Sequence, residues 1–392
     1  MSLCLRAALT AWLCLALCGA VPATAGEFTD SAGRIVVIPE HVERAMAADP
    51  AAEVLVYVLA PKKLVGWAMP PRGPMPKVGR LPVVGELTGA RPTATADTVR
   101  RLHPDIIIDC GLVTPARAAF ADQISKATGV PYILIDDSFD RAATMLRSVG
   151  RVLGVADRAD DLAGSAEHAV NALRGRLLIE PATKRPRIYY GRGPTGLETA
   201  LPGSGAAGAI DTAGAINVAA PLGTGGRAMV TLQQLHEWNP DLMLLQDRSA
   251  YASVWRNPAW RSLAAIRNKK VFLEPSAPFG WIDDPPGINR LIGLYWLSQV
   301  LYPGDALEDL RTLMADFYDK FYGIKLTDAQ IETIAKTAGI PPSDAPHMAS
   351  LPPLNPLPLP GVPGAVNEPG RRGVLPNATQ PLPTTPSYML PK

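Results

Sequence analysis

Apolar residues recur at helical spacing between residues 158 and 178, a stretch that contains no proline. The apolar positions are Leu162, Ala166, Ala169, Val170, Leu173 and Leu177. Steps of three and four residues place these side chains on one face of a helix. At about 1.5 Å per residue such a helix extends roughly 30 Å, enough to connect two small lobes. We therefore predict one long interlobe helix over 158–178.

The segments on either side of this helix resemble each other. Thr95–Asp105 reads TADTVRRLHPD and Thr231–Asp241 reads TLQQLHEWNPD, and each leads directly into an apolar segment of strand length. The match predicts two similar halves with a cleft between them.

Short apolar segments alternate with helical patterns of about ten residues in both halves, which is typical of βαβ units and a mostly parallel sheet. The predicted fold class is α/β, with two Rossmann-like lobes over 26–157 and 179–340 joined by the long helix. Near the end of the second lobe we predict helices over 288–301 and 307–322. Asp283 or Asp284 is expected to cap the first of these.

Residues 1–25 have the pattern of an export signal. Arg6 precedes the apolar run Ala7–Ala20, and Ala23–Ala25 supplies small residues for cleavage. We expect a periplasmic protein, with Cys18 as the modified residue of an alternative lipoprotein form. Leu17 is bulkier than the residue that lipoprotein processing usually requires. Once the signal is removed, Cys110 is the last cysteine, so no intramolecular disulfide is expected.

The C-terminal segment 341–392 is rich in proline, a composition that does not form a packed core. We predict a disordered or extended tail, with a proline-reading partner as the functional alternative. The formal net charge of +2, with no block of like charge, argues against nucleic-acid binding.

Candidate ligand-binding residues follow the predicted strands, because ligands of such sheets bind beyond the carboxyl ends of the strands. Arginine forks bind anionic oxygens, and aromatic faces stack on flat or apolar groups. These residue types predict an anionic ligand with flat or apolar portions. The candidates are Trp67, Met69, Tyr190, Arg192, Arg227, Arg248, Phe279 and Trp281.

Enzyme motifs are weak or missing in this sequence. Gly191–Gly196 matches G-x-G-x-x-G after a strand, but Pro194 and the following glycines leave no helix to hold a pyrophosphate. There is no G-x-S-x-G or Walker A motif, and the five histidines lack metal-ligand spacing. We therefore expect neither catalysis nor a bound cofactor or resident metal, and keep an exported α/β enzyme as a minor alternative.

Ten short motifs occur in an order that resembles one protein family. They are Thr29–Arg34, the strand that ends at Pro39, Leu102–Ile108, Gly129–Pro131, Gly150–Gly154, Ala213–Asn217, Trp238–Asp241, Pro258–Trp260, Lys270–Phe272 and Phe317–Gly323. Together they resemble periplasmic substrate-binding proteins of ABC importers for iron-siderophore, haem, cobalamin and related metal complexes, over about 27–338.

This resemblance implies two lobes on a rigid helical backbone, a ligand in the cleft, and delivery to a membrane permease driven by a separate ATPase. It also implies one acidic docking residue for the permease on each lobe. The matching positions are Asp97 and Gln233, with the nearby Glu237 as the alternative acid in the second lobe. We expect the protein to act as a monomer.

The expected ligand is an anionic metal complex, first of all a ferric siderophore or other iron chelate. Tyr190–Glu198 and Pro278–Pro286 resemble an iron-complex subgroup, some relatives of which bind oxyanions such as molybdate. Molybdate or tungstate, haem held by Tyr190 or His41, and cobalamin stay open as alternatives. A sensory or structural role that uses the proline-rich tail is a further alternative.

Overall fold

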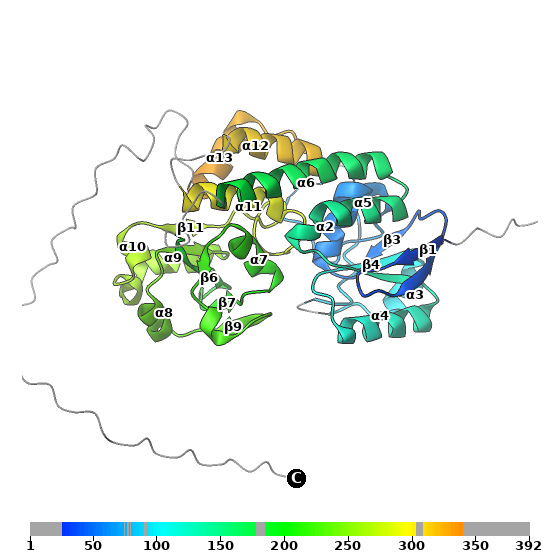
Figure 1. The fold of residues 1–392 in the computed structure, drawn as a ribbon, viewed down its shortest axis with the longest axis horizontal. Coiled ribbons are helices and arrows are strands. Elements are labelled where there is room, and N and C mark those ends of the chain that lie inside the picture. Colours follow the sequence, from blue (N-terminus) through cyan, green and yellow to red (C-terminus); the bar gives the residue numbers. More distant parts are fainter. Residues whose placement is uncertain are drawn as a thin grey trace, which may run out of the picture. The chain divides into compact units, whose positions relative to one another are not determined.

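The computed structural model describes residues 26–339 apart from 74, 77, 79, 90–91, 178–184 and 303–308 (Figure 1). The predicted export signal and the proline-rich tail lie outside the described residues. In the described part, no helix combines the length and the apolar character needed to cross a membrane.

The first lobe is built on a parallel sheet in the order β3-β4-β5, formed by Ala45–Ala47, Ile106–Cys110 and Tyr132–Ile135. Every residue of these strands is buried, as expected for a parallel sheet that is covered on both faces. An antiparallel hairpin, β1 (Gly26–Thr29) and β2 (Ile35–Ile38), precedes it. The helices are α2 (Pro50–Leu59), α3 (Ala96–Leu102), α4 (Pro115–Thr128) and α5 (Ala142–Val152), with short turns η1 (Pro61–Lys63) and η2 (Phe139–Arg141).

The second lobe contains a six-stranded sheet in the order β11-β10-β6-β7-β9, with β8 also paired to β6. Its strands are β6 (Arg187–Arg192), β7 (Glu198–Ala200), β8 (Ile216–Asn217), β9 (Arg227–Met229), β10 (Leu242–Leu245) and β11 (Val271–Leu273). Strands β6, β8, β10 and β11 are parallel, whereas β7 and β9 are antiparallel additions. The predicted mostly parallel α/β fold is confirmed.

Helices connect the strands of this second sheet, and others follow its last strand. They are α7 (Gly205–Thr212), α8 (Leu232–Trp238), α9 (Arg248–Arg256), α10 (Ala264–Arg267), α11 (Arg290–Leu301), α12 (Leu310–Phe317) and α13 (Asp328–Thr337). Three short turns accompany them: η4 (Ala220–Leu222), η5 (Pro258–Trp260) and the π-helical turn η6 (Tyr318–Tyr322).

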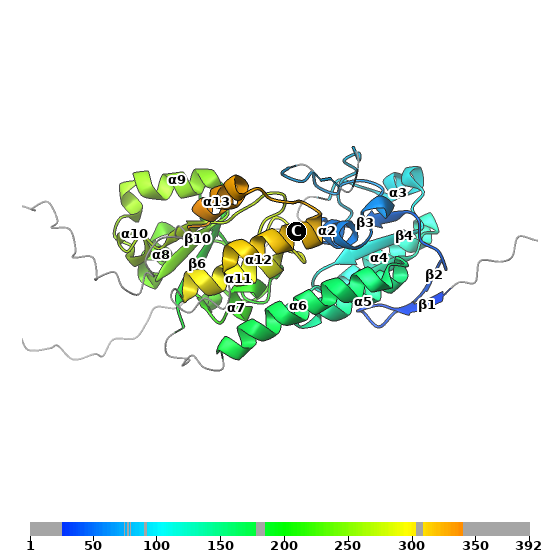
Figure 2. The same cartoon turned by 90° about the horizontal axis from the view of Figure 1, so that it is seen from above.

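The long helix α6 spans Ala156–Leu177, beginning two residues before the predicted start, and Leu178 lies outside the described residues. It packs against α5 from the first lobe and α11 from the second (Figure 2). The predicted apolar face is buried at Leu162, Ala166, Ala169, Val170 and Leu173.

The sequence repeat folds into two matching helix-to-strand units. Helices α3 and α8 each begin with a capping box at a threonine and end in a left-handed residue, His103 or Asn239. The aspartate that follows then binds a neighbouring strand: Asp105 Oδ2 accepts from Arg44 N at 2.7 Å, and Asp241 Oδ2 accepts from Arg187 N at 2.9 Å. The repeated Pro-Asp pair is therefore explained by strand alignment.

Two helix predictions need correction. Helix α11 begins at Arg290 with Asn289 at its N-cap, so capping by Asp283 or Asp284 is wrong. Both carboxylates instead form ion pairs, Asp283 with Arg192 and Asp284 with Arg72. The helix predicted over 307–322 is α12 followed by the π-helical turn η6, because the hydrogen-bonding pattern widens after Phe317.

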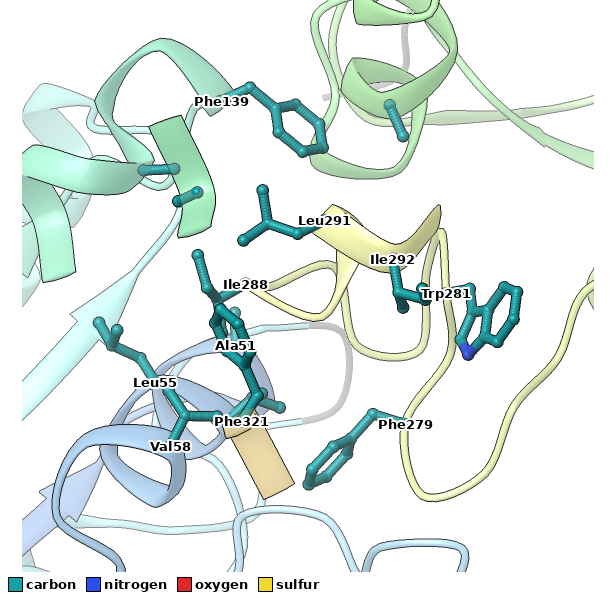
Figure 3. Close-up of a cluster of buried hydrophobic side chains, with 14 of the residues drawn as sticks. Ala51, Leu55, Val58, Phe139, Phe279, Trp281, Ile288, Leu291, Ile292 and Phe321 are labelled. Atoms are coloured by element: carbon teal, nitrogen blue, oxygen red, sulfur yellow. The ribbon is translucent and has the colours of Figure 1, made fainter. Parts of the chain in front are cut away.

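One hydrophobic core cluster contains residues of both lobes. Figure 3 shows part of it, where Ala51, Leu55 and Val58 of α2 face side chains from the end of the second lobe. Those partners include Phe279, Ile288, Leu291 and Phe321. The two sheets are separate, but the lobes share apolar packing beneath α6.

Candidate functional site

Polar side chains gather where the parallel strands of the first lobe end. Asp49 follows β3 and caps α2, its Oδ1 accepting from Ala52 N at 2.7 Å. Asp109 near the end of β4 accepts hydrogen bonds from Tyr132 Oη and Thr88 Oγ1, both at 2.9 Å. The Arg117 guanidinium lies between the two carboxylates, in contact with Asp109 and 3.4 Å from Asp49.

The Asp49 and Asp109 side chains are buried, and both lie close to Arg117. Burial raises the pKa of the Asp49 carboxyl well above its usual range, and the neighbouring Asp109 raises it further. The Arg117 guanidinium opposes this shift by favouring the charged form of Asp49. Because Arg117 already pairs with Asp109 and Asp49, its guanidinium is not free to pair with an anionic ligand.

In the second lobe, a cavity of about 310 Å³ lies at the carboxyl ends of β10 and β11, and we call it the strand-end pocket. It is lined by Arg72, Gln246, Asp247, Arg248, Leu273, Glu274, Pro275, Ser276, Ala277, Thr333, Ile334 and Thr337. Arg72 lies in the first lobe, in the loop between η1 and α3, so both lobes contribute to this pocket. Among the described residues, the Arg248 side chain has no ion-pair partner, whereas Arg72 pairs with Asp284.

Glu274 forms a buried polar wall of the strand-end pocket. Its Oε1 accepts from Ile282 N at 2.7 Å and Asp283 N at 2.9 Å, and its Oε2 accepts from Tyr190 Oη at 2.7 Å. Burial outweighs these hydrogen bonds and raises the pKa of Glu274 to about 8. The Glu274 side chain is therefore largely uncharged at neutral pH, which lowers its own repulsion of an anion.

The predicted arginines have three different environments. Arg248 lines the strand-end pocket. Arg192 is buried between two carboxylates, with Nη1 2.5 Å from Glu198 Oε1 and Nε 2.5 Å from Asp283 Oδ2. The second contact lacks hydrogen-bond geometry, so it is a close charge pair only. Arg227 on β9 is half exposed and lies 3.4 Å from Glu198.

The predicted aromatic residues are part of the core. The rings of Trp67 and Phe279 both pack near that of Tyr57, with centroids 5.8 and 6.5 Å from it, and Trp281 is fully buried. Tyr190 is also fully buried, and it contacts the strand-end pocket through Glu274. Met69 donates its backbone N–H to Glu53 Oε2 at 2.9 Å. A direct ligand contact by any of these residues stays a prediction.

The predicted docking positions lie on the exposed helices α3 and α8. Asp97 pairs with Arg100 one turn later. Gln233 donates from Nε2 to Glu237 Oε1 at 3.1 Å, so its amide supports the nearby carboxylate. Contact with a permease through these residues stays a prediction.

Sequence patterns missed Arg72 and Glu274 as lining residues of the strand-end pocket, and Arg290 and Asp137 as an ion pair between the lobes. Glu274 directly follows β11, a position that the strand-end rule points to. Arg72 lies in a loop without a regular pattern, and Arg290 opens a helix, where an arginine carries no signal of a distant partner. Among the described residues, no group of three or more His, Cys, Asp or Glu side chains is arranged to hold a metal ion.

Comparison with known proteins gives consistent matches over most of the chain. The molybdate-binding protein MolA of Haemophilus influenzae is 26% identical over 336 residues, covering 75% of this chain and 90% of that protein. Its molybdate-bound structure superimposes with a TM-score of 0.64, at 25% identity over 77% of this chain and 99% of that one.

Two further structures extend the comparison. An ABC transporter solute-binding protein of Sulfurospirillum deleyianum gives a TM-score of 0.71 at 25% identity, covering 79% of this chain and 99% of that one. The periplasmic haem-binding protein RhuT of a Roseiflexus species has the same fold, with a TM-score of 0.51 at 21% identity over 67% of this chain and 98% of that one.

Residues 72–278, just over half of the chain, match the family described as periplasmic binding protein. Proteins of this family capture solutes and are not enzymes, in agreement with the absence of a catalytic motif from the sequence. This chain belongs to the periplasmic binding protein family, the solute-binding components of ABC transporters.

Proposed function

We propose that this protein binds a small anionic solute, an oxyanion of the molybdate or tungstate class, in the strand-end pocket. The observation that carries the proposal is Arg248, whose side chain has no ion-pair partner among the described residues and lines a cavity that also contains Arg72. Arginine supplies several N–H donors in a fixed geometry that suits anionic oxygens.

The size of the pocket favours a small ion over a bulky chelate. Ligand pockets usually enclose about 300–1,000 Å³, and this one is at the low end at about 310 Å³. The aromatic faces that a haem or an aromatic siderophore would stack on are buried in the core at Trp67, Phe279 and Trp281. These features, together with the molybdate-binding relative, support an oxyanion ahead of the ferric chelate that the sequence first suggests.

Delivery to the permease is the second part of the proposal. Asp97 and the Gln233-supported Glu237 are exposed on α3 and α8, one helix from each lobe. We infer that these carboxylates contact basic residues of the permease, and that a separate ATPase drives import.

Calorimetric titration of the purified protein with molybdate and tungstate tests the ligand proposal, with sulfate, a ferric siderophore, haem and cobalamin as comparison ligands. Arg248→Ala should weaken molybdate binding about tenfold or more, because a charge-assisted hydrogen bond contributes about 1.5–3 kcal/mol. Arg227→Ala is the matched control, since Arg227 is a half-exposed arginine that does not line the pocket. Binding of a siderophore or haem with no response to oxyanions would overturn the proposal.

A further inference from the structure

Arg290 is the first residue of α11, and its guanidinium is almost completely buried. Its Nε donates to Gly287 O at 3.0 Å, and its Nη1 donates to Gly205 O at 2.5 Å. Its Nη2 donates to both the backbone oxygen and Oδ2 of Asp137, at 2.7 and 3.0 Å. The guanidinium also lies over the ring of Phe139, with Cζ 4.8 Å from the centroid.

The partners of Arg290 belong to different lobes. Asp137 and Phe139 follow β5 of the first lobe, whereas Gly205 is the first residue of α7 in the second. One side chain therefore connects the carboxyl end of a first-lobe strand to the start of a second-lobe helix. We call this set of contacts the Arg290 bridge.

The surroundings of the Arg290 bridge are built for close approach. A Cβ added at Gly208 of α7 would lie 3.6 Å from Arg290 Nη1, and one at Gly205 would lie 3.2 Å from Pro286. Helix α7 also packs against both α11 and the η2 turn that contains Phe139. The missing side chain at Gly205 thus lets α7 approach Pro286 closely, whereas a Cβ at Gly208 would make only ordinary contact with the guanidinium.

A lysine could not make the same set of contacts. The four hydrogen bonds need the planar fork of an arginine, whose donors point in different directions. The positive charge of Arg290 also balances the negative charge of Asp137, whose side chain is only 10% exposed and lies 3.0 Å from the guanidinium.

We propose that Arg290 is a positioning residue for solute binding, which fixes the separation of the two lobes without touching the solute. Its role in affinity rests on the proposed function, because the strand-end pocket takes Arg72 from one lobe and Arg248 from the other. Its role in interlobe geometry does not depend on which solute binds.

The test measures interlobe distance and affinity separately. Spin labels are introduced through non-canonical amino acids at the exposed positions Lys126 on α4 and Arg256 on α9, and their distance distribution is recorded by pulsed electron paramagnetic resonance. Molybdate binding is measured by calorimetry on the same proteins. Arg290→Lys should broaden the distance distribution and weaken molybdate binding at least fivefold.

The matched control is Arg311→Lys. Arg311 also joins two helices through a carboxylate, Nε lying 2.6 Å from Glu332 Oε1, but α12 and α13 are both in the second lobe. This control should leave the distance distribution and the affinity unchanged. Asp137→Asn gives a second route to the same result from the other lobe if Arg290→Lys fails to fold.

A distance distribution for both Arg290→Lys and Asp137→Asn that superimposes on that of the wild type would overturn the Arg290 bridge, even if affinity falls. If the wild type binds no molybdate, the proposed ligand fails, and the label distances alone decide whether Arg290 positions the lobes. Broadening in the variants and not in the control then supports the bridge.

Discussion

Glu274 illustrates how a single buried carboxyl can link the pocket to pH. Its pKa is raised from an ordinary 4.5 to about 8 by burial, so the folded protein binds this proton more tightly than the unfolded chain does. The folded state therefore holds more protons than the unfolded state between about pH 4.5 and 8. The contribution of Glu274 to the free energy of unfolding therefore falls as the pH rises through this interval, by up to about 1.4 kcal/mol per pH unit.

Glu274→Gln should remove this contribution, because glutamine keeps the shape and cannot ionise. We expect the difference in unfolding free energy between pH 5 and pH 8, measured by urea titration, to be smaller in the variant than in the wild type. Glu237→Gln, at an exposed carboxylate on α8, serves as the control and should retain the wild-type pH dependence. Equal pH profiles for the wild type and Glu274→Gln would contradict the assignment.

Residue types alone did not predict the surroundings of the candidate side chains. Arg192 ends β6 and Arg248 comes shortly after β10, yet Arg192 is enclosed by Glu198 and Asp283 whereas Arg248 lines the pocket. The difference arises from acidic residues distant in the sequence, so no local pattern records it. Trp67 and Phe279 pack into the core, which their residue types did not reveal, because a loop aromatic can pack inward as readily as it can line a cleft.

At the scale of elements, the contact of α5 with α6 depends on a small residue. A Cβ added to Gly150 would lie 2.1 Å from Ala159 Cβ, far inside van der Waals contact. Gly150→Ala should therefore destabilise the protein by about 1–3 kcal/mol through overpacking, despite the better helix propensity of alanine.

Gly164→Ala, within α6, is expected to have the opposite effect on stability. Nothing lies within 4 Å of a Cβ added at Gly164, so the substitution should stabilise the helix by up to about 1 kcal/mol. Chemical denaturation of the two variants beside the wild type measures both changes. A stabilising Gly150→Ala would show that α5 and α6 are not packed this closely.

Elements with a strong period were predictable and their exact ends were not. The apolar face of α6 follows from its spacing of three and four residues, and the structure confirms it. The antiparallel strands β7 and β9 were missed because they are short and include polar or charged residues, whereas the equally short β3 and β11 are wholly apolar. Helix α11 starts later than predicted because Ile288 and Asn289 form a turn, in which Arg290 N donates to Gly287 O at 3.0 Å.

At the scale of the whole molecule, the lobes are connected by polar contacts as well as by α6. Arg158 of α6 donates to Val58 O at the end of α2 and to Lys320 O in the η6 turn, at 2.6 and 3.2 Å. Tyr57 of α2 donates to Tyr322 O at 2.9 Å. With the Arg290 bridge at the strand ends, these contacts connect the lobes at separate places, which favours small relative motion.

Substitution of Phe279 tests whether the two lobes unfold as one unit. Its ring lies 6.5 Å from that of Tyr57 in the first lobe and 5.6 Å from that of Tyr322, within the shared hydrophobic core. Phe279→Ala should lower the unfolding free energy by about 3–5 kcal/mol, since it removes a buried aromatic side chain and leaves a cavity. The exposed Leu112 offers a control, and Leu112→Ala should change stability by less than about 0.5 kcal/mol.

Because the core is shared, tryptophan fluorescence and far-ultraviolet circular dichroism should report one coincident transition in the wild type. The same single transition is expected at lower denaturant concentration in Phe279→Ala. Two separate transitions would instead show that the lobes unfold independently. Loss of solute binding without loss of stability would place Phe279 at the ligand.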